Sequence, residues 1–428
     1  ETNVALNMLV ILYKFLIFIF YLPFIVLIFL RKLIKKEHPH KYKEKIFLNK
    51  IIRPKGFLIW FHAASIGELK SILPLVEYYL KQNPNSYFLI TTVTLSSYNE
   101  FERRFNSNKR VFHQFMPYDF NFLIENFFKN WRPDIASFVD SEIWPNFILK
   151  INKEKIPLIL LNARITKKSF QRWRVFGKTT KKIFGCFSTC ISSSTITSQY
   201  LKTLGAQNIK FYGNIKFCSS IEKDSHNKNQ FNNISKRKVW CALSTHFDEE
   251  NLCAKTHLIA KKKVGNILTI IIPRHIHRIN KIYANLRNLG LEVQIKDEID
   301  DINNFADVIL VNYYGSVNKY LKNINQIFIG KSTIEKFENS GGQNPLDAAK
   351  IGCHIYHGPY VSNFEDIYKF LDNTGISEEI TNADDLANKL EKNFKKNIEI
   401  NSEKIEKINT FSNEIFKNLI NEYNKYIK

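Results

Sequence analysis

The chain has 428 residues, of which 44% are hydrophobic and 35 are phenylalanine. This length suits two domains of about 150–200 residues, and the composition excludes an intrinsically disordered chain. The net charge of +22 predicts acidic partners, although the abundant Lys, Asn, Ile and Phe are also what an A/T-rich coding bias produces. Because the lysines are scattered, without interleaved aromatic residues or a known reader motif, nucleic acid is not an expected partner.

The six cysteines include no Cys-x-x-Cys pair and no histidine cluster at zinc spacing. This pattern predicts reduced thiols in a cytosolic compartment, with neither a disulfide framework nor a structural metal. The cysteines are Cys186, Cys190, Cys218, Cys241, Cys253 and Cys353.

Residues 8–30 are apolar almost throughout, interrupted only by Lys14 and Pro23. The run is long enough for one membrane-spanning helix of about 20 residues, and it can also lie at the interface with only residues 15–30 immersed. No small-residue cleavage site follows, which disfavours a signal peptide. We assign residues 1–34 to a membrane anchor and its basic flank. Basic residues after the run predict cytoplasmic retention of the rest of the chain and attraction to anionic headgroups. They are Arg31, Lys32, Lys35, Lys36, Lys41, Lys43 and Lys45.

Strand and helix patterns alternate from residue 57 onward. Residues 57–61 form a short apolar run typical of a buried parallel strand, and apolar side chains at helical spacing follow from Leu69 to Leu80. The alternation predicts a first Rossmann-like domain over residues 35–217. Its further strands are expected at 87–93, 111–116, 135–139, 158–161 and 190–192.

A polar stretch rich in Asn, Lys and Ser, residues 218–237, is expected to be a linker. The alternation then restarts and predicts a second Rossmann-like domain over residues 238–401. Residues 402–428 have apolar side chains at i, i+3 and i+4 spacing, which predicts an amphipathic helix. The fold class is therefore α/β, with two tandem Rossmann-like domains. Strands of the second domain are expected at 239–243, 267–272, 308–311, 326–329 and 354–356.

The residues with chemical potential gather after the predicted strands. Open α/β sheets bind ligands beyond the carboxyl ends of their strands, so two such domains facing each other would form a cleft for two substrates. The segments at these ends are 62–68, 140–144, 162–164, 213–216, 273–274 and 341–347.

Seven of the chain's segments, taken in order, resemble those of the Kdo transferases, which are membrane-anchored glycosyltransferases of the two-Rossmann (GT-B) architecture. Kdo is 3-deoxy-D-manno-octulosonic acid, the acidic sugar of lipopolysaccharide. Any single motif is weak, but the ordered set is specific, and the resemblance runs from the N-terminal anchor to about residue 366. The matching segments are Phe61–Glu68, Asp140–Asn146, Leu161–Arg164, Gly213–Phe217, Ser244–His246, Pro273–His275 and Gly341–Asp347.

The resemblance implies transfer of Kdo from CMP-Kdo to a lipid A precursor, lipid IVA, in lipopolysaccharide core biosynthesis, at the cytoplasmic side of a bacterial inner membrane. It makes residues 35–217 the acceptor domain and residues 238–401 the CMP-Kdo-binding domain. The expected partners are CMP-Kdo, the lipid A precursor and anionic inner-membrane lipids. Neither a cofactor nor a metal is expected, because the chain has no Asp-x-Asp motif to hold a metal beside the leaving group.

Glu68 opens the first predicted helix. Ser65-x-x-Glu68 fits a capping box, and a carboxylate in the first turn of a helix is also favoured by the helix dipole, so a structural role is one interpretation. The resemblance instead makes Glu68 the general base, which accepts the proton of a sugar hydroxyl as its oxygen attacks.

Glu142 and Lys216 are assigned by the resemblance to stabilising the transition state. By pattern alone, Glu142 is also readable as a loop carboxylate and Lys216 as an ordinary exposed lysine. Lys216 would offset the charge that grows on the departing phosphate. Glu142 would either stabilise an oxocarbenium-like sugar or orient another group, and both alternatives remain open.

The resemblance places CMP at two segments of the second domain. Arg274 can grip phosphate with its guanidinium or form a salt bridge. Asn344 and Pro345 read as the cap and first residue of a helix whose free N–H groups suit an anion, with Asp347 placed for the ribose hydroxyls. The expected donor-binding residues are Pro273, Arg274, Tyr314, Gly315, Ser316, Asn344, Pro345, Leu346 and Asp347.

Three segments depart from the family pattern. Gln343 and Asp347 stand where the family usually has His and Glu, and the shorter Asp347 implies a longer or water-bridged ribose contact. Tyr314-Gly315-Ser316 is the nearest match to a Met-Gly-Glu-like turn that contacts CMP, but it lacks the carboxylate. The stretch Lys331–Ser340 is longer than usual.

Two alternatives remain beside Kdo transfer. One is another GT-B glycosyltransferase that uses a different nucleotide sugar. The other is a non-catalytic, membrane-anchored protein that binds acidic lipid. The presence of Glu68, Lys216 and Arg274 together argues against the second alternative, because a decayed site is expected to have lost some of them.

Overall fold

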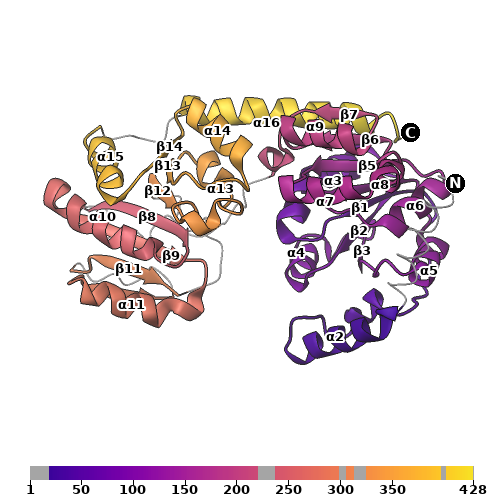
Figure 1. The fold of residues 1–428 in the computed structure, drawn as a ribbon, viewed down its shortest axis with the longest axis horizontal. Coiled ribbons are helices and arrows are strands. Elements are labelled where there is room, and N and C mark those ends of the chain that lie inside the picture. The colour runs from indigo at the N-terminus through magenta and orange to yellow at the C-terminus, as the bar shows by residue number, and fades with distance from the viewer. Residues whose placement is uncertain (1–18, 220–236, 298–304, 313–323, 397–401, 428) are drawn as a thin grey trace. The chain divides into compact units, whose positions relative to one another are not determined.

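The computed structural model describes residues 19–219, 237–297, 305–312, 324–396 and 402–427. The chain divides into two compact units, Glu1–Ser220 with Ser412–Lys428, and Ile221–Phe411. Within the described residues, each unit contains one seven-stranded sheet in which every pair of neighbouring strands is parallel (Figure 1). The predicted α/β class with two parallel-sheet domains is thus confirmed.

The first unit is built on a sheet of strand order β3-β2-β1-β4-β5-β6-β7. The chain moves outward from β1 to β3 and then returns to β4 beside β1, so the order reverses between β1 and β4. Such a switch point is where open α/β sheets bind their ligands. The strands are β1 (Phe57–His62), β2 (Ser86–Thr92), β3 (Val111–Phe115), β4 (Ile135–Val139), β5 (Leu158–Ala163), β6 (Thr189–Ser192) and β7 (Ile209–Phe211).

Helical crossovers join these strands, and aromatic side chains fill the core. Trp60 of β1 is fully buried and contacts Phe127, Phe138 and Phe147 at ring-centroid distances of 4.7, 5.2 and 5.9 Å. The helices are α2 (Tyr21–Leu33), η1 (Lys41–Lys45), α3 (Ile66–Gln82), α4 (Leu95–Phe105), α5 (Asn121–Trp131), α6 (Pro145–Lys153), α7 (Lys167–Val175), α8 (Gly177–Phe184), α9 (Thr195–Leu204) and η2 (Ile215–Cys218). The helically spaced residues of α3 are all buried, as their pattern predicts: Leu69, Ile72, Leu73, Val76 and Leu80.

The second unit has a sheet of order β10-β11-β9-β8-β12-β13-β14, which reverses between β8 and β12. Its strands are β8 (Lys238–Thr245), β9 (Ile267–Pro273), β10 (Val293–Lys296), β11 (Val308–Val311), β12 (Gln326–Ile329), β13 (His354–His357) and β14 (Ser377–Glu379). Its helices are α10 (Glu249–Val264), η3 (Ile276–Arg278), α11 (Ile279–Asn288), η4 (Glu335–Phe337), α13 (Leu346–Lys350), α14 (Glu365–Asn373) and α15 (Ala383–Lys395).

Three strands lie outside the predicted set, namely β7, β10 and β14. All three are the outer strands of their sheets, have three or four residues and keep several side chains partly exposed. A short edge strand is covered less completely than a central one, so it lacks the continuous apolar run by which the buried strands are found.

Helix α16 (Ser402–Tyr423) matches the predicted amphipathic helix, with Ile408, Ile415 and Leu419 buried. The chain from Ser412 onward belongs to the first unit. There the hydroxyl of Tyr423 donates to Ser137 Oγ at 2.7 Å, and Thr189 Oγ1 donates to Glu422 at 3.1 Å. The predicted linker, residues 218–237, lies almost entirely outside the described residues.

The predicted anchor, residues 8–30, is described only from residue 19 onward. Helix α2 packs one side on the first unit, where Tyr21 contacts the rings of Phe120 and Phe122 at 5.1 and 5.0 Å. Large apolar side chains on its other side are exposed. They are Leu22, Val26, Leu27, Phe29, Leu30 and Leu33. Within the described part of the chain, no helix has both the length and the apolar character required to cross a membrane.

The basic residues after α2 do not all face solvent. Lys45 is buried at 3% exposure, where its ammonium pairs with Glu37 and donates to the carbonyl of Val93. Arg31 also pairs with Glu37, at 2.7 Å. The expectation that Lys45 contacts lipid headgroups was therefore wrong, because an internal carboxylate already holds its charge.

Candidate active site

Glu68 lies in the first turn of α3, directly after β1. The turn is closed by mutual hydrogen bonds: Ser65 Oγ accepts from the Glu68 N–H at 3.4 Å and donates to Glu68 Oε1 at 2.8 Å. Glu68 Oε2 accepts from the N–H of Ala64 at 2.8 Å. This arrangement resembles the predicted capping box, except that the carboxylate reaches the residue before the cap. The Glu68 carboxylate is therefore held in one orientation.

The acidity of Glu68 is strongly perturbed. Burial, and after it the negative charges of Asp140 and Glu142, raise the pKa of Glu68 to about 7, despite opposing hydrogen bonds from Ser65 and Ala64. Both causes disfavour the charged form of the carboxyl group. A carboxylate with a pKa near neutrality is a stronger base than an ordinary glutamate and is still available in its ionised form, which suits general-base catalysis.

Glu142 lies beyond β4 and has two fixed donors. Trp144 Nε1 donates to its Oε2 at 2.7 Å, and Nε2 of the fully buried His62 approaches the same oxygen at 3.3 Å. Burial opposes the charged form, but hydrogen bonding and charge from His62 and then the bond from Trp144 together lower the pKa of Glu142 below its ordinary value. Glu142 is thus held ionised, and its negative charge acts on Glu68.

Lys216 is held beside Asp140. Its Nζ lies 3.1 Å from Asp140 Oδ2, while Asn162 Nδ2 donates to Asp140 Oδ1. The side chain of Asn162 also accepts from the N–H of Ile215 at 3.0 Å, so it joins the end of β5 to the turn that carries Lys216. Asp140 and Asn162 both have left-handed backbone, with φ of 56° and 55°. Non-glycine residues adopt this conformation uncommonly, and here it aims both side chains at the site.

The structure therefore brings Glu68, Glu142 and Lys216 to the carboxyl end of the first sheet, around its switch point. Two members of the network, His62 and Asn162, and its connecting carboxylate Asp140 are absent from the predicted site residues. The available signal was their position in the motifs, because His62 ends β1, Asp140 follows β4 and Asn162 lies near the end of β5.

In the second unit, Pro273 and Arg274 lie at the end of β9. Pro273 is buried, and the N–H of Arg274 donates to the carbonyl of Thr245 at 3.0 Å. The Arg274 side chain is exposed and makes no hydrogen bond or ion pair to any described residue. The predicted salt-bridge alternative for Arg274 is thus not realised among the described residues, and its guanidinium is available to a ligand.

The segment Asn344–Asp347 leads into α13 as the capping pattern predicts. Asn344 Oδ1 accepts from the N–H of Leu346 at 3.2 Å, and the helix begins at Leu346, one residue later than expected. α13 spans only five residues, so its dipole is small and the local N–H groups are the main attraction it offers an anion. The side chain of Asp347 is exposed.

Gly341 and Gly342, which precede α13, allow the chain to lie close to the backbone of Tyr360 and Val361. A Cβ on Gly341 would lie 2.0 Å from the carbonyl oxygen of Tyr360, which no side chain can accommodate. Gly342 has a φ of +85° and donates its N–H to the carbonyl of Lys331 at 2.7 Å. Tyr368 adds a bond to the carbonyl of Gln343 at 3.0 Å. These contacts fix the segment at which the sequence predicts CMP.

A buried carboxylate, Glu249, holds the neighbouring loops together. It accepts from the backbone N–H groups of His246, Lys331, Ser332 and Thr333 at 2.6–3.2 Å, and from the Thr333 hydroxyl at 3.0 Å. The turn after β8 and the loop after β12 are thereby joined. With its oxygens occupied in this way, Glu249 supports the site rather than reacting in it.

Tyr314, Gly315 and Ser316 lie outside the described residues, so their predicted contact with CMP stays a prediction. Among the residues that the structure does describe, no group of three or more His, Cys, Asp or Glu side chains has the arrangement of a metal site.

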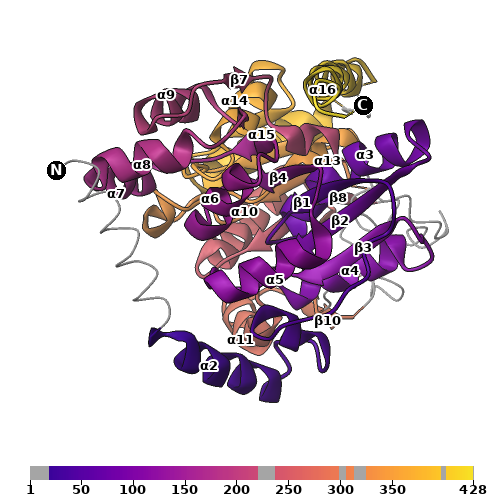
Figure 2. The same cartoon turned by 90° about the vertical axis from the view of Figure 1, so that its right-hand side faces the viewer.

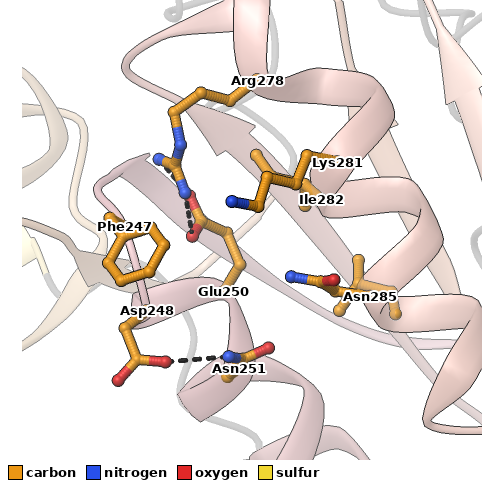
Figure 3. A pocket seen from close by; sticks show the side chains of 9 residues that line it. Phe247, Asp248, Glu250, Asn251, Arg278, Lys281, Ile282 and Asn285 are labelled. Atoms are coloured by element: carbon orange, nitrogen blue, oxygen red, sulfur yellow. Dashed lines mark hydrogen bonds and ion pairs between the residues drawn. The ribbon is translucent and has the colours of Figure 1, made fainter.

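Figure 3 shows a small cavity of about 120 Å³ between the beginnings of α10 and α11. Arg278 pairs there with the buried Glu250 at 3.0 Å, and Asn251 donates to Asp248 at 2.8 Å. Phe247 lies under Arg278, 5.6 Å from ring centroid to guanidinium. The volume is well below the roughly 300 Å³ at which small-molecule sites begin, and the Arg278 charge is already paired. We assign no substrate to this cavity.

Comparison with known proteins decides the family. Residues 35–219 match the family described as 3-deoxy-D-manno-octulosonic-acid transferase (kdotransferase). The 3-deoxy-D-manno-octulosonic acid transferase of Rickettsia bellii is 33% identical over 384 residues, which cover 89% of this chain and 90% of that protein. The chain belongs to the Kdo transferase family. It is therefore a glycosyltransferase. A Kdo transferase of Haemophilus influenzae is 26% identical over 79% of each chain.

Solved structures agree on the fold of this transferase. A glycosyltransferase from Rickettsia africae superimposes with a TM-score of 0.59 at 13% identity, covering 88% of this chain and all of that one. The UDP-GlcNAc 2-epimerase of Neisseria meningitidis gives a TM-score of 0.55 at 12% identity, covering 85% of this chain and all of that one. Proteins of different activities thus share this two-domain architecture, so the reaction must be argued from the site.

Proposed function

We propose that this transferase moves Kdo from CMP-Kdo to a hydroxyl of a lipid A precursor, lipid IVA, with inversion at the anomeric carbon. The observation that supports the reaction best is Glu68, a fixed carboxylate whose pKa is raised to about 7, in a member of the Kdo transferase family. Membership of the family supports the proposed donor and acceptor, and the geometry of Glu68 supports its proposed role as the base.

In the proposed step, Glu68 accepts the proton of the acceptor hydroxyl as that oxygen forms a bond to the anomeric carbon of Kdo. The bond between this carbon and the phosphate oxygen of CMP breaks, and CMP leaves with the electron pair. Because the desolvated carboxylate gains a proton, its unfavourable buried charge disappears as the reaction proceeds. The raised pKa therefore favours the direction of transfer.

We assign the other two candidate residues of the first unit, Lys216 and Glu142, to stabilising charges that develop in the transition state. Lys216 is a cation already held by Asp140, and we assign it to the negative charge that develops on the departing phosphate. Glu142 is held ionised by His62 and Trp144. Its charge raises the pKa of Glu68 and would stabilise a positively charged, oxocarbenium-like sugar.

In the second unit, the exposed Arg274 guanidinium would hold the CMP phosphate, with help from the N–H groups around Asn344 to Asp347. The exposed carboxylate of Asp347 would meet the ribose hydroxyls. CMP is a monophosphate leaving group, and Arg274 and Lys216 would supply positive charge for it. We therefore propose that the transfer requires no divalent metal.

The proposed location is the cytoplasmic side of a bacterial inner membrane. The row of exposed apolar side chains along α2 supports attachment to a bilayer. Deleting residues 1–30 should give a protein that binds anionic vesicles weakly and in a salt-sensitive way, because screening acts within about 8 Å at physiological ionic strength. Vesicle binding of the truncated protein that ignores lipid charge, or release of the intact chain by salt alone, would contradict this location.

The proposed function is tested by incubating the purified chain with lipid IVA and either CMP-Kdo or another nucleotide sugar, and by measuring product masses. We expect Kdo addition only with CMP-Kdo, unchanged in excess EDTA. Faster transfer from a different donor would favour the alternative GT-B activity. Vesicle binding without any product would favour the non-catalytic alternative. EDTA inhibition that magnesium reverses would show that a metal is required.

A further inference from the structure

An exposed basic and apolar surface lies on α7 and α8 of the first unit and includes none of the residues assigned above. We call it the α7–α8 surface, and it comprises Lys168, Arg172, Val175, Phe176, Lys178 and Lys182. Val175 is 81% exposed and Phe176 is 50% exposed, and α7 has no buried residue at all. Adjacent exposed apolar side chains rimmed by polar residues are typical of an interaction surface.

The conformation of the turn between the two helices places its apolar residues, Val175 and Phe176, toward solvent. α7 ends at Val175 and α8 begins at Gly177, whose φ is +43°. Thr180 Oγ1 donates to the carbonyl of Trp173 at 2.6 Å, which locks the turn from the inside. The Trp173 ring packs on Phe184 at 5.5 Å. Because these neighbours face the core, the exposure of Val175 and Phe176 is a fixed feature of the turn.

The charge of this region is of one sign. Between Glu154 and Glu222 the sequence has twelve Lys and Arg residues and not a single Asp or Glu. Lys168, Arg172 and Lys178 are exposed, and none forms an ion pair with a described residue. An uncompensated basic surface of this kind attracts anions, and it does so most strongly when many anions lie in one plane.

The apolar pair distinguishes between the possible anionic partners. Single-stranded nucleic acid is bound by basic side chains together with aromatic rings that stack on bases. Val175 provides no ring, and Phe170 of α7 is already stacked on Tyr200 at 4.1 Å, so Phe176 is the single aromatic ring of the α7–α8 surface. An aliphatic and an aromatic side chain at a turn surrounded by Lys and Arg instead fit the headgroup and acyl boundary of a bilayer. Figure 2 shows α7 and α8 at the left and α2 at the lower left of the first unit.

We propose that the α7–α8 surface is a second contact of this transferase with an anionic lipid bilayer, in which Val175 and Phe176 enter the interface and the basic residues meet phospholipid headgroups. The proposal rests on the membrane location given under the proposed function. It adds a contact that is independent of the N-terminal segment. The transferase would then be held to the bilayer at two places, which fixes its orientation as well as its location.

The test uses the full chain with a polarity-sensitive fluorophore at Val175→Cys, in a Cys186→Ser and Cys218→Ser background. The other four cysteines are buried and should not react. A matched probe at Lys262→Cys, exposed on α10 of the second unit, serves as control. With vesicles containing phosphatidylglycerol, we expect the probe at position 175 to shift to shorter wavelength and to be protected from acrylamide, while the control probe stays accessible.

A charge variant tests the basic half of the surface. In Lys168→Gln/Arg172→Gln/Lys178→Gln, the concentration of phosphatidylglycerol vesicles needed to protect the probe at 175 should rise about 100-fold, because each of the three basic residues near an anionic surface contributes about fivefold. The matched control, Lys262→Gln/Lys392→Gln/Lys396→Gln, removes the same charge from exposed positions of the second unit and should change nothing. Circular dichroism checks that each variant is folded.

Equal accessibility of the two probes in anionic vesicles would overturn the proposal, as would protection by RNA in preference to vesicles. Transfer to detergent-dispersed acceptor separates this proposal from the reaction itself. A charge variant with normal transfer in detergent and lost protection on vesicles supports the surface. An inactive wild type that still protects the probe at 175 would refute the proposed reaction and leave the lipid contact standing.

Discussion

The candidate residues of the two units differ in how far they are already fixed. In the first unit, Glu68, Glu142 and Lys216 each have named partners that hold them in place. In the second unit, the exposed side chain of Arg274 makes no hydrogen bond or ion pair to a described residue, and the order lies in the neighbouring loops. Groups that move protons or stabilise a transition state must be aligned before the reaction, whereas groups that capture a substrate must first be accessible to it.

The buried carboxylates of the two units also differ in their surroundings. The first unit keeps Asp140, Glu142 and Glu68 close enough that the first two raise the pKa of the third. The buried carboxylate of the second unit, Glu249, instead accepts from four backbone N–H groups of its own loops. Neighbouring negative charge favours proton uptake by Glu68, whereas the four amide donors join Glu249 to its own loops.

The largest expected effect is the fall in turnover when Glu68 is substituted. Glu68→Gln can keep the bonds to Ala64 and Ser65, so the fold should persist while turnover falls about 100-fold or more, the contribution of a general base. Steady-state transfer of Kdo to lipid IVA measures it. Glu77→Gln is the matched control, because Glu77 lies on the same helix and only pairs with Arg104 at the surface. A folded Glu68→Gln variant with most of its turnover would remove Glu68 from the mechanism.

The second-largest expected effect compares the loss of Lys216 in the first unit with the loss of Arg274 in the second. Lys216→Ala should lower kcat about 10- to 100-fold, because a cation aimed at the leaving phosphate is lost during the reaction. Arg274→Ala should mainly raise the KM for CMP-Kdo, about tenfold, because a charge-assisted phosphate contact is lost on binding. If Arg274→Ala changed only kcat and Lys216→Ala only KM, the division between a fixed and a capturing half would be wrong.

The third effect concerns pH. Glu68 must be ionised to accept a proton, so kcat/KM should rise about tenfold per pH unit up to about pH 7 and level off above it. Asp140→Asn removes one of the charges that raise the pKa of Glu68, so the inflection should move to lower pH. An inflection that stays in place in Asp140→Asn would show that the first unit's carboxylates are not coupled.

The smallest effect is on stability. Burial and like charge raise the pKa of Glu68 from 4.5 to about 7, so the unfolded chain releases this proton first as pH rises. The folded state therefore loses stability between pH 4.5 and 7, and above that range Glu68→Gln should be the more stable protein, by up to about 3 kcal/mol. Urea unfolding at pH 8 and pH 5 measures this, and most of the difference should vanish at pH 5. A variant less stable than wild type at pH 8 would contradict the raised pKa.

Central strands and motif order could be predicted from sequence because both are local. Ile135–Val139, Val308–Val311 and Gln326–Ile329 begin and end as their apolar runs predict. The connections of Asp140 could not be predicted, because its partners Asn162 and Lys216 meet it only after three strand ends are assembled. Asp140 and Asn162 have left-handed backbone, and although Asp and Asn adopt it more often than other non-glycine residues, residue type alone does not mark the positions at which it occurs.

The burial of Lys45 escaped prediction for a related reason. A lysine in a basic run looks solvent-exposed until the fold brings a carboxylate to it, and here Glu37 does so from eight positions earlier. The second-unit residues were easier to interpret, because Asn344 and Pro345 carry the local signature of a helix start. The helix start at Asn344 could thus be predicted from the sequence, whereas the hydrogen-bond network around Glu68, Glu142 and Lys216 required the structure.

The position of the C-terminal segment has a consequence for biosynthesis. Ser137 on the central strand β4 and Thr189 on β6 receive their partners Tyr423 and Glu422 from the end of α16. During translation, the ribosome must therefore synthesise the whole second unit before the first unit can be completed, whereas domains generally fold as units from the N-terminus. Until then Ser137 and Thr189 lack these partners, so the unit that carries Glu68 reaches its final form only after the second unit has been synthesised.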